Sequence, residues 1–123
     1  MINVAVYGSL KKGLHNHHLL KSIRAKGGLV TSISGFDLYP YYDSMFPCIV
    51  RGTGCVEVEV YSIDEEDLEI LDTLEGYPHF YKRCLVTTNL GTLVWIYYHE
   101  EPPSTEKVEH GNWMKYLKEN NYV

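Results

Sequence analysis

INVAVYGSL, residues 2–10, is an apolar run with β-branched side chains that stops abruptly at Gly8. A run of this length and composition is typical of a buried strand, which we expect over residues 2–7. Residues 8–13 should then form a loop, in which the glycine lets the following backbone N–H groups turn toward a ligand. The start of the chain therefore predicts a buried strand that leads into a candidate anion-binding loop.

Two further segments carry strand patterns. Residues 29–39 are rich in β-formers around Gly35, which predicts a bent or bulged strand. In residues 55–61, valines at 56, 58 and 60 alternate with Glu57 and Glu59. This period of two predicts that the valines face the core and the glutamates face outward.

The clearest helix signal follows directly. Ser62 and Glu65 have the spacing of a capping box, and leucines at 68, 71 and 74 form an apolar stripe that ends near Glu75. Gly76 is suited to a left-handed C-cap. Glu75 thus lies at the negative end of the helix dipole, which favours a raised proton affinity.

The remaining segments complete an α+β pattern. Residues 81–88 and 92–99 predict a hairpin around Asn89-Leu90-Gly91, and residues 15–23 and 113–118 predict short helices. Many strands with few helices suggest a small mixed β-barrel with helices packed outside it. We expect one domain over residues 1–123.

Composition narrows the function classes. Of the 123 residues, 45% are hydrophobic and 22% are charged, as in ordinary globular proteins. Sixteen acids against eleven lysines and arginines give a net charge of −5, which disfavours nucleic acid and anionic membranes as partners. The three cysteines form no CxxC pair, which favours a reduced, cytoplasmic compartment. We expect a monomer or a weak homodimer that acts on a small molecule.

Several motifs resemble one known family. Residues 4–13, with Asn16-His17 close behind, resemble the opening of the γ-glutamylamine cyclotransferase and avirulence-induced-gene-like group. Residues 54–64 lead into Leu71-Asp72-Thr73-Leu74-Glu75-Gly76-Tyr77-Pro78 and Tyr81-Lys82-Arg83 in the order that this family uses, and Gly111-Asn112-Trp113 is similar to its closing motif. The resemblance implies a γ-glutamyl cyclotransferase-like fold, with a cavity between the Tyr-Gly-Ser-Leu loop and the acid after the helix.

The resemblance also implies a reaction. A γ-glutamyl amide carries its own nucleophile, an α-amine that attacks the side-chain carbonyl and closes the ring of 5-oxoproline. On this basis Glu75 is the general acid/base for a γ-glutamylamine or a related amide, and no metal or cofactor is needed. The substrate-binding residues that the resemblance implies are Tyr7, Gly8, Ser9, Leu10 and Tyr81.

Other site assignments compete with this one. Asp72 is a rival acid one turn before Glu75, and Arg83 either assists a carboxylate site or lies on the surface of a strand. Cys48 lacks an identifiable histidine partner, so we expect a buried or inert thiol. The histidines at 15, 17 and 18 lack further metal ligands at suitable spacing, which favours a polar loop.

Other functions compete as well. The glycines at 8 and 13 match half of a phosphate-loop motif, but Leu14 and His15 occupy the positions where lysine and serine or threonine are required. A nucleic-acid-binding barrel is disfavoured by the acidic charge. The main alternative is a non-catalytic module that binds a small ligand or a protein on the same fold.

Overall fold

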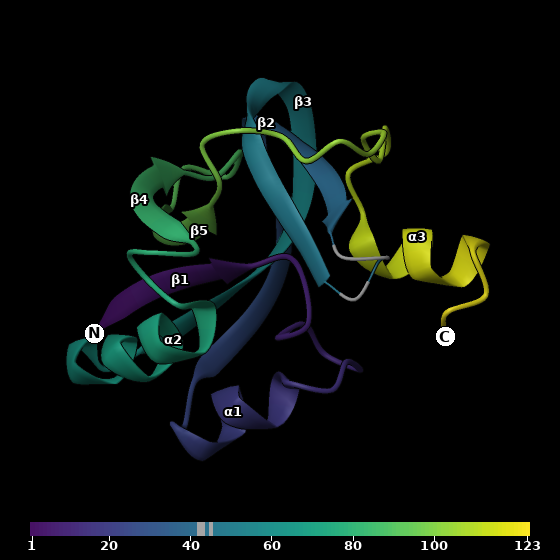
Figure 1. The fold of residues 1–123 in the computed structure, drawn as a ribbon. Helices are drawn as coiled ribbons and strands as arrows, with labels where there is room; N and C mark the ends of the chain where they lie inside the picture. The colour runs from purple at the N-terminus through teal and green to yellow at the C-terminus, as the bar shows by residue number, and fades with distance from the viewer. Residues whose placement is uncertain (42–43, 45) are drawn as a thin grey trace.

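A five-stranded sheet organises the molecule (Figure 1). The computed structural model describes residues 1–41, 44 and 46–123. The strands are β1 (Ile2–Val6), β2 (Lys26–Tyr41), β3 (Phe46–Ile63), β4 (Lys82–Thr87) and β5 (Leu93–Tyr98). They lie in the order β2-β3-β1-β5-β4, with β1 parallel to β5 and the other neighbouring pairs antiparallel. The first strand of the chain is therefore central in the sheet.

The predicted α+β class is confirmed, but the sheet is an open one with edges at β2 and β4. "Barrel" thus describes its curvature only loosely. The long strands β2 and β3 pair from Lys26 opposite Ser62 to Tyr41 opposite Phe46, with register shifts near Gly27 and Gly35. Gly35 has a φ of +91°, so the predicted bend occurs where a residue without a β-carbon tolerates it.

Both faces of the sheet are covered, as the two sides of β1 show. Its side chains alternate, so that Val4 and Val6 join one buried cluster while Ala5 joins the other. Helix α3 (Trp113–Glu119) packs on the Ala5 side. Helices α1 (His17–Ser22) and α2 (Leu68–Glu75), the latter preceded by a 3₁₀ turn η1 (Glu65–Asp67), pack on the other side.

The covered second face corrects the expectation that both glutamates of β3 face outward. The valines at 56, 58 and 60 are buried as predicted, but Glu59 is also buried, with 8% of its surface exposed. Its carboxylate accepts hydrogen bonds from the Lys12 backbone N–H (2.8 Å) and the Tyr61 hydroxyl (2.9 Å). Glu57 is partly exposed and forms an ion pair with the buried Lys11 (3.5 Å). The two carboxylates hold the loop that follows β1.

The predicted capping box does not form. Ser62 pairs with Asn3 and Lys26 inside the sheet, because the buried side chains on either side of it extend β3 to Ile63. The helical segment begins later, after Asp64, and among the described residues no side-chain hydrogen bond caps either η1 or α2 at its start. Leu74 also departs from the predicted apolar stripe, since 39% of its surface is exposed.

The last two elements agree with the sequence. The β4–β5 hairpin turns at Gly91, whose φ is +87°. In α3, Asn112 accepts a hydrogen bond from the Lys115 N–H as the N-cap, and Trp113 and Leu117 are buried. Over the described residues, no helix combines the length and the apolar character that crossing a bilayer requires.

Candidate active site

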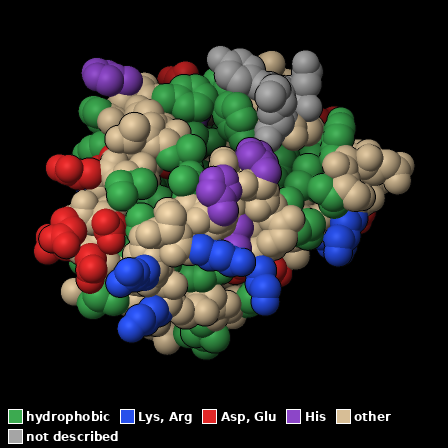
Figure 2. Space-filling view, turned by 90° about the horizontal axis from the view of Figure 1, so that it is seen from below, with side chains coloured by type: hydrophobic (Ala, Val, Ile, Leu, Met, Phe, Trp, Pro, Cys, Tyr) green, Lys and Arg blue, Asp and Glu red, His purple; other side chains and the backbone are tan. Residues whose placement is uncertain are grey.

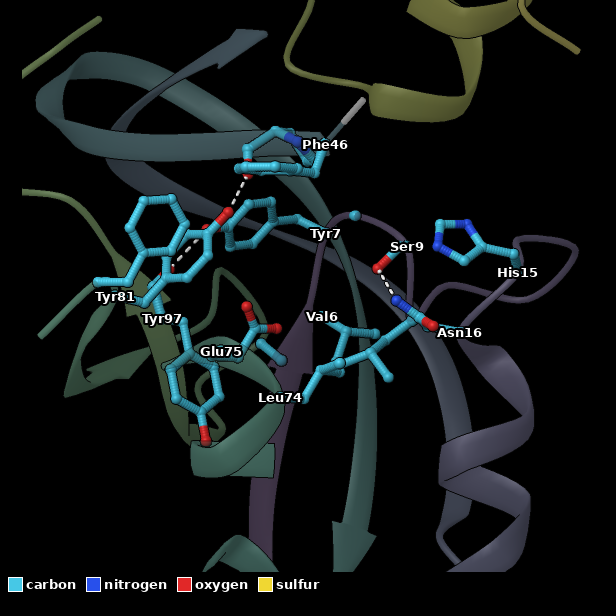
Figure 3. A pocket seen from close by; sticks show the side chains of 15 residues that line it. Val6, Tyr7, Ser9, His15, Asn16, Phe46, Leu74, Glu75, Tyr81 and Tyr97 are labelled. Atoms are coloured by element: carbon cyan, nitrogen blue, oxygen red, sulfur yellow. Dashed lines mark hydrogen bonds between the residues drawn. The ribbon is translucent and has the colours of Figure 1, made fainter. Parts of the chain in front are cut away.

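A cavity of about 240 Å³ opens where the end of β1, the start of β3 and the end of α2 meet (Figure 3). This volume lies just below the ~300–1,000 Å³ typical of drug-sized ligand pockets, so it suits a small substrate. All of the residues that the sequence predicted for the site line the cavity, namely Tyr7, Gly8, Ser9, Leu10, Glu75 and Tyr81.

Glu75 is the last residue of α2 and lies at the cavity wall. The helix ends there because Gly76 adopts the left-handed conformation (φ +67°), and the Tyr77 N–H returns to the Asp72 carbonyl (2.9 Å). Burial raises the pKa of Glu75 from its ordinary 4.5 to about 7. No hydrogen bond or ion pair from the described residues holds its carboxylate. Such a group can both accept and donate a proton at neutral pH.

Tyrosines surround this carboxyl group (Figure 3). The Tyr7 hydroxyl donates to the backbone carbonyl of Tyr97 (2.8 Å), and the Tyr81 hydroxyl donates to the carbonyl of Pro47 (2.6 Å). Burial raises the pKa of both tyrosines, and the nearby charge of Glu75 contributes to both shifts. Their hydroxyl protons are committed to backbone carbonyls, and their rings form walls of the cavity.

The rival acid Asp72 is engaged elsewhere. Its carboxylate receives two hydrogen bonds from Arg83 (2.8 and 3.2 Å) and one from the Tyr97 hydroxyl (2.7 Å). Neither Asp72 nor Arg83 lines the cavity, and the guanidinium stacks over Tyr77 and Trp95. The pair ties α2 to the sheet and thereby positions the end of the helix that carries Glu75.

The loop after β1 supplies backbone groups to the cavity. A β-carbon at Gly8 would lie 2.7 Å from Cγ of Pro47, so the close approach of this proline requires glycine. Gly8 does not have a positive φ, so the contact with Pro47 is what favours glycine at this position. Within the described chain, the N–H groups of Ser9 and Leu10 have no hydrogen-bond partner, whereas the N–H of Lys11 donates to the Gly8 carbonyl (2.9 Å). Two adjacent free N–H groups can hold an anion.

Part of the cavity lining was not predicted from the sequence. The missed residues that bear on the argument are Asn16, Phe46, Pro47, Leu74 and Phe80. Phe46 and Pro47 begin β3, in a stretch without the alternation that would have predicted a strand. Phe80 directly precedes the predicted Tyr81, and this adjacency in sequence could have indicated that Phe80 also lies at the cavity. Asn16 follows the loop and donates a hydrogen bond from Nδ2 to the Ser9 hydroxyl (2.9 Å).

The alternative sites, a metal site at the histidines and a nucleophile at Cys48, lack the geometry that their chemistry requires. Figure 2 shows histidine side chains near one another on the face formed by α1 and the loop before it. However, His17 Nδ1 donates to the Leu10 carbonyl (2.9 Å) and His18 Nδ1 donates to the His15 carbonyl (2.8 Å). In the part of the chain that the structure describes, no three His, Cys, Asp or Glu side chains could share a metal ion. Cys48 is fully buried, and burial raises its pKa to about 12, which keeps the thiol protonated.

Comparisons with known proteins agree with this cavity. The family model "Gamma-glutamyl cyclotransferase, AIG2-like" matches residues 4–115. A Vibrio cholerae protein named "Putative gamma-glutamylcyclotransferase" is 36% identical over 112 residues, covering 89% of this chain and 93% of that protein. Gamma-glutamylaminecyclotransferase C of Danio rerio is 40% identical over 91 residues, which span 68% of this chain and 60% of the zebrafish protein.

A solved structure has the same fold over nearly the whole chain. The crystal structure of an uncharacterized protein from Pyrococcus horikoshii superposes with a TM-score of 0.82 at 30% identity, covering 99% of this chain and 98% of that one. The chain belongs to the gamma-glutamyl cyclotransferase, AIG2-like family. It is therefore a member of a family of cyclotransferase enzymes, and the predicted family and enzyme class are confirmed.

Proposed function

We propose that this protein cyclises the γ-glutamyl group of a γ-glutamylamine or a related γ-glutamyl amide, releasing 5-oxoproline and a free amine. The observation that carries the proposal is the Glu75 carboxyl, unpaired among the described residues and with a pKa raised to about 7, in the same cavity as Ser9 and Leu10, whose N–H groups have no partner in the described chain. The names of the relatives, gamma-glutamylcyclotransferase and gamma-glutamylaminecyclotransferase, support the same reaction.

The proposed reaction uses Glu75 as the only proton carrier. Its carboxylate takes a proton from the substrate α-ammonium, and the freed amine attacks the γ-carbonyl carbon, which closes a five-membered ring. The C–N bond to the departing amine then breaks as the Glu75 carboxylic acid protonates that nitrogen, and the regenerated carboxylate carries the second proton from the ring nitrogen to the departing amine. Overall, the attacking nitrogen loses two protons and the departing nitrogen gains two, so the amine leaves as an ammonium ion and the carboxylate is regenerated.

The loop and the tyrosine walls have supporting roles in this proposal. The N–H groups of Ser9 and Leu10 would bind the substrate α-carboxylate, which fixes the end of the flexible glutamyl chain. Fixing that end favours the cyclising conformer, an orientation effect that lowers the barrier to ring closure. Tyr7 and Tyr81 line the cavity and limit the conformations of the methylene groups. The substrate supplies the nucleophile, so the enzyme needs none.

The test is a panel of γ-glutamyl amines and γ-glutamyl dipeptides, with 5-oxoproline detected by mass spectrometry. We expect 5-oxoproline from the wild-type protein and from Glu69→Gln, which alters an exposed acid of the same helix. The Glu75→Gln protein should produce none above background. A wild-type protein that binds these amides without turning any of them over would instead be the non-catalytic ligand-binding module.

A further inference from the structure

The cavity has a polar end and an aromatic end, with Glu75 between them (Figure 3). At the polar end, Ser9 and Asn16 are hydrogen-bonded to each other (2.9 Å) beside the free N–H groups of the loop. At the other end lie the rings of Phe46 and Tyr81. A substrate that spans the cavity therefore meets opposite chemistry at its two ends.

Phe80 completes the aromatic end. Its ring centroid lies 5.9 Å from that of Phe46 and 5.1 Å from that of Tyr81, in edge-to-face geometry with both. The side chain is nevertheless 39% exposed, as is Leu74, which also lines the cavity. Large apolar side chains left open in a cavity are the surface that an apolar ligand group covers.

This end offers little to a charged group. The Tyr81 hydroxyl proton is already donated to Pro47, and among the described lining residues Glu75 is the only acid, with no lysine or arginine. His99 packs edge-to-face on Phe80 and Tyr81 at centroid distances of 5.0 and 4.4 Å, and burial lowers its pKa, which favours the neutral ring. Lys82 and Glu100 lie beyond Phe80 in a neighbouring depression, where they pair with each other at 3.7 Å. An apolar substituent placed against these rings loses less hydration than a charged one and covers more of their exposed apolar surface.

The aromatic end and the acid belong to one hydrogen-bonded turn. The Phe80 N–H donates to the Gly76 carbonyl (2.8 Å), and the Tyr81 N–H donates to the Glu75 carbonyl (3.3 Å). Phe80 is thereby fixed relative to the carboxyl group that must reach the departing nitrogen. Because the glutamyl carboxylate takes the polar end, the substituent on that nitrogen is left with the aromatic end.

We propose that Phe46, Phe80 and Tyr81 form the subsite for the departing amine, and that this subsite selects γ-glutamyl amides of uncharged, apolar amines, above all arylalkyl amines. The inference rests on the proposed function, since it assigns the half of the substrate that cyclisation releases. Phe80 is then a specificity residue that touches the departing group and takes no part in proton transfer.

The test compares three substrates that differ only in the amine: γ-glutamyl benzylamide, γ-glutamyl methylamide and Nε-(γ-glutamyl)lysine. For the wild-type protein we expect kcat/KM for the benzylamide to exceed both others by about 10- to 100-fold. Phe80→Ala should remove most of that advantage and leave the methylamide nearly unchanged. Phe80→Glu should shift the preference toward the lysine derivative, whose α-ammonium then finds a carboxylate. Leu85→Ala, which alters an exposed leucine of β4 away from the cavity, is the matched control.

The outcomes separate this inference from the proposed function. Two results would overturn the subsite but not the cyclisation. One is wild-type turnover that prefers the lysine derivative, and the other is an equal loss of kcat/KM for all three substrates in Phe80→Ala. Absence of 5-oxoproline from every substrate would overturn the cyclisation. In that case calorimetry with Glu75→Gln protein decides the subsite. Tighter binding of the benzylamide than of the methylamide, abolished by Phe80→Ala, supports it, and equal binding rejects it.

Discussion

Replacing Glu75 with glutamine tests two properties of this residue separately: its role in proton transfer and the stability lost by burying its charge. Glutamine keeps the size and polarity of the side chain but cannot carry a proton at neutral pH. Loss of a general acid/base typically lowers a rate by about 10²- to 10⁴-fold. We therefore expect kcat for a γ-glutamyl amide to fall by at least about 100-fold, with KM changed much less because the loop groups that bind the glutamyl carboxylate remain.

The same substitution should stabilise the fold, and the effect should depend on pH. A rise in pKa from 4.5 to about 7 corresponds to about 3 kcal/mol of unfavourable free energy for the charged carboxylate in the folded state. Between these two pH values the folded state binds more protons than the unfolded state, so the free energy of unfolding of the wild-type protein falls as pH rises. The penalty is absent below about pH 4.5 and complete above about pH 7.

Urea unfolding measures this directly. Glu75→Gln should raise the free energy of unfolding by about 1–3 kcal/mol at pH 8 and by much less at pH 4.5. Glu69→Gln, at an exposed position of the same helix, should show no such difference. An equal gain for Glu75→Gln at both pH values would refute the raised pKa. Turnover by Glu75→Gln near the wild-type rate would refute its role in catalysis.

Four further predictions address the loop, the rival acid, pH and metals. Gly8→Val should raise KM by about tenfold or more, because its side chain would collide with Pro47, whereas Ser9→Ala should have a smaller effect; equal, negligible changes would exclude the loop as the anion site. Asp72→Asn should lower the free energy of unfolding by about 1–3 kcal/mol while turnover persists, and selective loss of turnover would make Asp72 the base. The value of kcat/KM should rise with pH up to about 7, as Glu75 loses its proton, and a flat profile between pH 5 and 8 would contradict this. Exhaustive chelation should leave the rate unchanged; recovery of a lost rate on adding zinc would indicate a metal enzyme.

Local sequence patterns were sufficient to predict the features whose conformation depends on a few neighbouring residues. The strand that begins at Ile2, the bend at Gly35, the left-handed cap at Gly76 and the hairpin turn at Gly91 all follow from residue types acting over a few positions. The predicted site residues also come to one cavity, although they were assigned through a family resemblance and not through spacing.

Long-range contacts account for what could not be predicted. The alternation in β3 places Glu59 on the face predicted to point outward. That face is covered by the loop after β1, and Glu59 accepts a hydrogen bond from the Lys12 N–H of this loop. The contact between Gly8 and Pro47 joins separate segments, so neither residue alone indicates it. Phe46 and Phe80 meet only in the folded chain, which is why the aromatic end of the cavity left no pattern in the sequence.

The central position of β1 has a consequence for how this protein reaches its folded state. The Tyr7 hydroxyl and the Tyr97 carbonyl are 90 residues apart, and the parallel partner of β1 is the late strand β5. The β2–β3 hairpin can form early from neighbouring segments, whereas joining β1 to β5 requires closing most of the chain into a loop, which is slow. During synthesis the edge of β1 that pairs with β5 stays unpaired until residues 93–98 have emerged. Refolding yield should therefore fall as protein concentration rises, because these waiting apolar strands can pair between molecules.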